Sequence, residues 1–136
     1  MLRKDYIVRQ FEEFGKVMAI IFGLKKQKDF VNFEKELNEA ALKFTALDIN
    51  YVEDLLETDF NAKILNATSL TSQQQHMLAD LLFEKLNYYL QINTATKVLN
   101  LKQKCTQLYK LINSNQTQNE FNLDVYYKLS FLETIV

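Results

Sequence analysis

Proline is absent from this 136-residue sequence, and glycine, cysteine and histidine are scarce: there are two glycines, one cysteine and one histidine. Sheet proteins and loop-rich folds place many Gly and Pro residues at their turns, so this scarcity favours a few long helices with short connections. The single cysteine, Cys105, excludes an intrachain disulfide. A glycine-rich phosphate-binding loop cannot be built from Gly15 and Gly23, which lie eight residues apart.

The sequence also lacks an excess of charge of one sign. Lys and Arg number 16 against 17 Asp and Glu, which gives a formal net charge of −1 and a pI near 5.9. Nucleic-acid-binding proteins normally carry a basic excess, so we expect no nucleic-acid partner. The longest apolar run, residues 17–22, is too short to cross a bilayer, and the first ten residues are mixed and charged. We therefore expect a cytoplasmic protein without a membrane partner.

Residues that carry enzyme or metal chemistry are few. His76 has no second His or Cys nearby to complete a zinc site, and no candidate nucleophile lies at an informative spacing from it. Four acids cluster without the spacing of a calcium loop, and we expect them to form a solvated helix face: Glu53, Asp54, Glu57 and Asp59. Cys105 lies on an apolar stripe, which predicts a buried core residue. We predict no catalytic residues, no metal, no cofactor and no enzymatic activity.

The residues that are present predict helices around a substantial core. Ten Phe and seven Tyr contribute to a hydrophobic fraction of 48%. Apolar residues recur at intervals of three and four over 5–22, 29–47, 78–91, 98–112 and 121–134, with a shorter helix expected over 51–57. We predict one all-α domain over residues 1–136, with five or six helices packed as antiparallel hairpins. Its parts are an N-terminal hairpin (1–47), a connecting segment (48–70), and a second hairpin with a final helix (71–136).

Local signals place several helix ends. Gly23 is expected to end the first helix, and Asn50 to cap the helix over 51–57 with Glu53 as its reciprocal partner. Thr71, three residues before Gln74, predicts the start of the next long helix. Asn93 is expected to end that helix in the left-handed conformation, and Thr94 is a plausible cap for its successor.

The helix over 5–22 is apolar on more than one side in its second half, and such a helix needs two neighbours or a second subunit. Our hypothesis is that Val17, Ile20, Ile21 and Phe22 form a self-association surface, which a charged substitution at Ile20 would weaken. The alternative is that helices of the same chain cover both sides.

Two further features suggest surface roles. In the pairs Tyr88-Tyr89 and Tyr126-Tyr127 one ring can enter the core while the other meets a partner, so Tyr88 and Tyr127 are candidate partner-surface residues. The alternative is that the second ring lies along its own helix. Three lysines after the first helix, Lys25, Lys26 and Lys28, are interpreted as a solvated corner rather than a phosphate or membrane contact.

Residues 78–112 resemble a tetratricopeptide repeat, a helix-turn-helix unit of about 34 residues. Leu82 and Tyr89 match the bulky and aromatic positions of its first helix, Asn93 stands at the turn, and Val98 and Cys105 occupy the small-residue positions of its second helix. The sequence departs from the family pattern at two residues, Leu86 and Lys102, and lacks the closing Pro. Residues 29–47 resemble the same repeat more weakly, with Phe33, Leu37 and Ala40 at comparable positions. The opening MLRKDYIVRQ followed by a helical hairpin also resembles a small group of uncharacterised bacterial proteins with repeat-like helical folds.

This resemblance implies protein–protein binding by analogy only. We expect a non-catalytic interaction or scaffold module that binds an unidentified protein partner and forms homo-oligomers, most simply a homodimer. The alternative function is a small-molecule-binding bundle with a cavity lined by Phe and Tyr side chains.

Overall fold

The structure is a computed structural model that describes residues 2–66, 69–115 and 122–135, with side chains described from Asp5 onward. Within those residues the chain is all-α and contains no strand. The elements in chain order are α1 (Leu2–Lys26), α2 (Phe30–Thr45), α3 (Ile49–Asp54), α4 (Glu57–Phe60), the π-helical segment η1 (Asn61–Leu65), α5 (Ser72–Gln91), α6 (Ala95–Ser114) and α7 (Leu123–Glu133).

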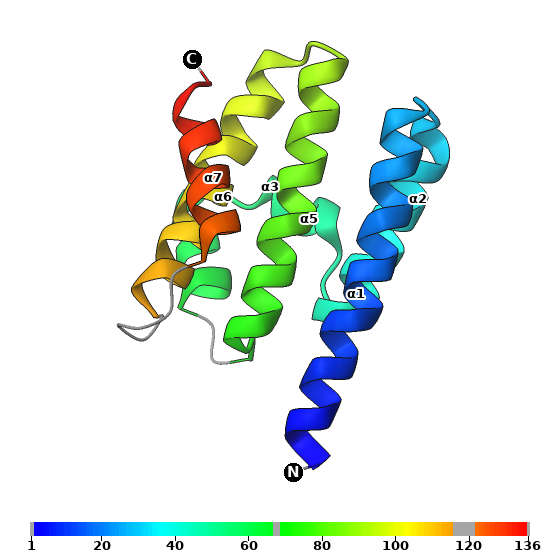
Figure 1. Cartoon of the computed structure of the whole chain (residues 1–136). Helices are drawn as coiled ribbons and strands as arrows, with labels where there is room; N and C mark the ends of the chain where they lie inside the picture. The colour runs from blue at the N-terminus through cyan, green and yellow to red at the C-terminus, as the bar shows by residue number, and fades with distance from the viewer. Residues whose placement is uncertain (1, 67–68, 116–121, 136) are drawn as a thin grey trace.

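Figure 1 shows two pairs of long helices side by side. The helices α1 and α2 form one antiparallel pair at an edge of the molecule, and α5 and α6 form the other. The pairs meet where α2 packs against α5, and α7 lies against α6. One continuous cluster of buried apolar side chains extends from Phe14 in α1 to Leu132 in α7, so the two pairs share a single core.

The long helices support this core to very different extents. The central helix α5 buries ten of its 20 residues. By contrast, α1 has 25 residues, and among its described side chains only Phe14, Ile21 and Lys25 are buried. This difference makes α5 the axis of the fold and leaves α1 at its periphery.

The end of α1 differs from the sequence-based expectation. The helix continues through Gly23 to Lys26, and no glycine in the described residues has a positive φ. Lys28 takes the left-handed conformation instead, with φ 61°, and its backbone N–H donates to the carbonyl of Lys25 at 3.1 Å. The turn is thus made by a lysine, and the basic residues beyond Gly23 suit the negative end of the helix dipole.

Other helix ends follow local chemistry closely. The expected capping box is present, since the Thr71 hydroxyl accepts from the backbone N–H of Gln74 at 3.1 Å and the Gln74 side chain accepts from that of Thr71 at 3.0 Å. Asn93 has the expected left-handed conformation, with φ 59°. Thr94 occupies the cap position of α6 without a side-chain cap bond.

The connecting segment contains more helix than expected, and α3 begins earlier than expected. Asp48, not Asn50, caps α3: its carboxylate accepts from the backbone N–H groups of Asn50 at 2.8 Å and Tyr51 at 3.3 Å. The described residues contain seven α-helices rather than five or six, because two short helices lie between α2 and α5. None of the helices in the described part of the chain combines the length and the apolar character that crossing a bilayer requires.

Candidate functional site

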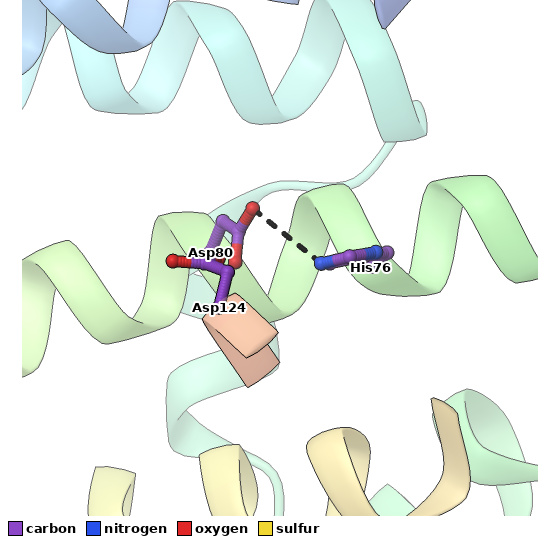
Figure 2. Close-up of side chains that lie close together, drawn as sticks. All are labelled: His76, Asp80 and Asp124. Carbon is purple, nitrogen blue, oxygen red and sulfur yellow. Dashed lines mark ion pairs between the residues drawn. The ribbon is translucent and has the colours of Figure 1, made fainter. Parts of the chain in front are cut away.

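A polar cluster near the surface is formed around Asp80, on α5 (Figure 2). His76 lies one turn earlier on α5, and Asp124 comes from the first turn of α7. The imidazole Nε2 of His76 is 3.8 Å from Asp80 Oδ2. Two further groups reach Asp80 Oδ1: the Tyr109 hydroxyl of α6 donates at 2.6 Å and the Lys128 ammonium of α7 at 2.9 Å. We call these five residues the Asp80 cluster.

The electrostatics of the Asp80 cluster are those of a satisfied ion-pair network. Burial alone would lower the pKa of Lys128, but the charges and hydrogen bonds of Asp80 and Asp124 outweigh burial and raise it. Burial, assisted by the Asp80 charge, raises the pKa of Tyr109 well above its ordinary value. The tyrosine therefore stays a neutral donor, and the lysine stays charged.

A divalent cation is the ligand that the donor atoms would suit. One ligand atom each from His76, Asp80 and Asp124 lies within 4.8 Å of the other two, and such N and O donors can hold zinc. However, Lys128 Nζ lies 2.9 Å from one carboxylate and 3.0 Å from the other. Its charge already occupies the position that a cation shared by the two carboxylates would need. We interpret the cluster as a clamp that fastens α7 to α5 and α6.

A second polar cluster lies deeper, around Glu53 at the end of α3. The Lys85 ammonium is 2.5 Å from Glu53 Oε1 and also donates to Asn50 Oδ1 at 2.6 Å, while the Tyr89 hydroxyl donates to Glu53 Oε2 at 2.6 Å. The Lys104 ammonium donates to the backbone carbonyl of Glu53 at 2.5 Å. Every buried side-chain polar atom of the described residues has a hydrogen-bond partner. We call this set the Glu53 cluster.

The burial of Glu53 overturns the expectation of a solvated acidic face. Its residue is 6% exposed, whereas Asp54, Glu57 and Asp59 are exposed as predicted. The local sequence could not predict that Glu53 is buried and its acidic neighbours exposed, because the partners of Glu53 lie 32 to 51 residues further along the chain. Burial raises the pKa of Tyr89 and lowers that of Lys104, the second effect being opposed by the Glu53 charge.

Cys105 is a core residue, as the sequence predicts. It is fully buried, and burial together with the nearby Asp80 charge raises the pKa of its thiol. A reactive thiol needs exposure and a lowered pKa. The side chain therefore acts as a small hydrophobic group in the packing of α6.

The four predicted self-association residues are distributed over different sides of α1. Ile21 is fully buried in the chain's own core and Val17 is half-buried, so helices of the same chain cover these two side chains. Ile20 and Phe22 are 53% and 51% exposed. Because two residues span about 200° of a helix, Ile20 and Phe22 face different directions.

The two candidate tyrosines have different surroundings. The ring of Tyr88 is half-buried between Phe30 and Phe33 of α2, at centroid distances of 4.9 and 5.3 Å. Tyr127 is 61% exposed on α7. Of the two, Tyr127 is the one that offers most of its ring to a partner.

Two surface hollows involve residues that the sequence singled out. A groove of about 370 Å³ lies between the α5–α6 turn and the end of α7; Tyr89, Val98, Phe131 and Ile135 are among its lining residues. A second hollow is lined by Lys25, Lys26 and Lys28 with Phe30 and Gln91. The Lys25 ammonium is paired with Glu84 at 2.7 Å, which leaves the hollow with two lysines that are exposed.

Comparison of the chain with models of known protein families, with curated proteins and with solved structures gave no match.

Proposed function

We propose that this protein is a non-catalytic interaction module of the cytoplasm that self-associates through α1, on a scaffold of tetratricopeptide-like helical hairpins. The observation that carries the proposal is the exposure of apolar side chains on α1, where Tyr6, Val8, Phe11, Ile20 and Phe22 are each at least 40% exposed. Exposed apolar residues scattered singly are normal, but five on one helix that contributes little to the core favour a binding role.

Two further observations support an interaction role over an enzymatic one. The residues with acid–base or metal chemistry, in the Asp80 and Glu53 clusters, are saturated by partners within the chain. A general base or nucleophile must instead reach a substrate atom. The second support is the resemblance of residues 78–112 to a tetratricopeptide repeat, because repeats of that kind present extended binding surfaces.

The test is the mass of the protein in solution. Light scattering across a range of concentrations should give a dimer that dissociates on dilution. A monomer throughout the range would contradict the proposal.

A second candidate function is small-molecule binding in the groove lined by Tyr89 and Phe131. Its volume of about 370 Å³ lies within the range of ligand pockets. If the groove binds apolar ligands, the folded protein should enhance the fluorescence of an apolar dye, and Phe131→Ser should reduce that enhancement. Equal enhancement by both proteins would argue against this function.

A further inference from the structure

One face of α1 is exposed along its whole described length. Residues spaced three and four apart, Val8, Phe11, Gly15, Ala19, Phe22 and Lys26, are all exposed. This spacing places them on a single side of the helix, about 110° around the axis from the side that carries buried Phe14 and Ile21. We call these six residues the α1 outer row. In Figure 1, α1 lies with α2 at one edge of the molecule, and its N-terminal end extends beyond the other helices.

From the α1 outer row we propose that α1 pairs with α1 of a second copy, antiparallel, with Gly15 of each chain against the partner's Ala19. This inference rests on the self-association proposed above and specifies its surface and symmetry.

The first argument is the order of large and small side chains in the row. Phe11 and Phe22 flank the two small residues, Gly15 and Ala19, so the order is nearly the same in both directions. A two-fold axis near residue 17 would place Gly15 opposite the partner's Ala19 and Phe11 beside the partner's Phe22. A two-fold interface uses the same patch on both subunits and requires this kind of self-complementarity.

The second argument is the charge along the same side of the helix. The acids Asp5 and Glu12 lie toward its N-terminal end, whereas Lys16 lies near its middle and Lys26 toward its C-terminal end, and all four are exposed. In the antiparallel arrangement the partner's Lys26 would lie opposite Val8, between Asp5 and Glu12. A parallel, in-register pair would instead place like charges together. Charge complementarity of this kind fixes the orientation of partners.

Gly15 supports a close approach from outside the chain. It lies in the interior of α1, where glycine is less favourable than alanine. A Cβ added there would meet no atom within 4 Å. Nothing inside the chain therefore requires a glycine, whereas small residues allow the backbones of two helices to approach closely.

The experiment is analytical ultracentrifugation of the full chain and of matched variants. Phe22→Asp and Phe11→Asp should each raise the dimer dissociation constant roughly tenfold or more, as for loss of a central aromatic anchor. Val31→Asp is the control, because Val31 is an exposed apolar residue of α2, outside α1, and it should leave the dissociation constant unchanged. Ile20→Asp changes an exposed apolar residue on another side of α1 and should raise the dissociation constant less than Phe22→Asp. Circular dichroism checks that each variant remains helical.

Orientation is tested by charge reversal and by a distance. Glu12→Lys and Lys26→Glu should each weaken the dimer several-fold, and the double variant should recover most of the loss.

A spin label at Arg9→Cys, in a Cys105→Ala background, should show a separation of about 24 Å along the helix axis in the antiparallel dimer, at 1.5 Å per residue. A separation near one helix diameter, about 10 Å, would indicate a parallel pair and overturn the proposed orientation.

The outcomes separate this inference from the proposed function. A dimer that is lost with Ile20→Asp but retained with Phe22→Asp overturns the α1 outer row as the interface, while self-association stands. A monomer at every concentration overturns both.

Discussion

Glu53 shows how much a single buried charge depends on distant residues. Its carboxylate forms an ion pair with Lys85 and accepts a hydrogen bond from Tyr89, both on α5. Its backbone carbonyl accepts a hydrogen bond from Lys104 of α6. A buried ion pair adds little net stability compared with apolar packing, but the loss of one partner leaves an uncompensated charge. Each member of the Glu53 cluster is therefore necessary once the others are present.

We expect Glu53→Gln to lower the free energy of unfolding by about 3–5 kcal/mol, because it leaves the Lys85 ammonium buried without a counter-charge. Urea unfolding measures the loss. The matched control is Glu57→Gln on exposed Glu57, which should change the free energy by no more than about 0.5 kcal/mol. Combining Glu53→Gln with Lys85→Met should recover part of the loss, and equal stability of the Glu53 variant and its control would refute the role of the cluster.

The buried hydroxyl of Tyr109 makes stability depend on alkaline pH. Its pKa in the folded state is raised above the ordinary value of 10.0 by burial and by Asp80. The stabilising contribution is therefore complete below pH 10 and is lost above it, because the unfolded chain releases the proton that the folded chain retains. The free energy of unfolding should fall by about 1.4 kcal/mol per pH unit for each such tyrosine.

Other groups modify this alkaline transition. The pKa of Cys105 is raised above its ordinary value of 9.0, so the free energy of unfolding should begin to fall near pH 9. The raised pKa of Tyr89 should add to this fall above pH 10. Lys104, whose pKa is lowered, acts in the opposite direction. Urea unfolding at several pH values should show a shallower slope above pH 10 for Tyr109→Phe than for the unmodified chain. Parallel slopes would count against the assignment.

At the scale of the element, α7 is the helix most dependent on side-chain anchors. It has 11 residues, of which only Val125 and Leu132 are buried. Lys128 ties it to Asp80 of α5, and the Lys102 ammonium of α6 donates to the carbonyl of Ile135 just beyond its end at 2.6 Å. A helix this short is marginal without tertiary contacts.

Lys128→Met should therefore loosen α7 selectively. We expect faster amide hydrogen exchange over residues 123–133, with exchange in α5 little changed because Tyr109 still donates to Asp80. Lys110→Met is the matched control, because Lys110 is exposed on α6 and the substitution removes the same charge. Uniform acceleration across all helices, or none in α7, would show that Lys128 does not clamp this helix.

At the scale of the whole molecule, the contact of α2 with α5 joins the two helical pairs into one cooperative unit. The shared buried cluster spans every long helix. A chain of this size with one core normally unfolds in a single transition. Such cooperativity allows α1 to stay folded although it buries few side chains.

Thermal unfolding followed by far-ultraviolet circular dichroism and by near-ultraviolet tyrosine absorption should give coincident curves. Phe33→Ala, which removes a fully buried ring of α2, should lower the midpoint in both signals together. Two separate midpoints would indicate that the pairs unfold independently. The Glu39→Ala variant, at an exposed side chain of the same helix, is a control and should shift the midpoint much less.

The helical class, most of the long helices and several of their ends could be predicted from the sequence alone, because they depend on interactions within a few residues. Thr71 and Gln74, one turn apart, form the two hydrogen bonds of a capping box. Asn93 adopts the left-handed conformation, which asparagine tolerates better than most residues. The spacing of apolar residues likewise predicted the burial of Cys105.

Which charges are buried and which apolar side chains are exposed depends on tertiary packing and could not be predicted from local sequence. Glu53 and Asp54 are neighbours in the sequence, yet one is buried by α5 and α6 and the other faces solvent. Ile21 and Phe22 are likewise neighbours, yet Ile21 is fully buried and Phe22 is 51% exposed. The physical reason is that burial depends on which helices pack against a given face, and those helices come from distant parts of the chain.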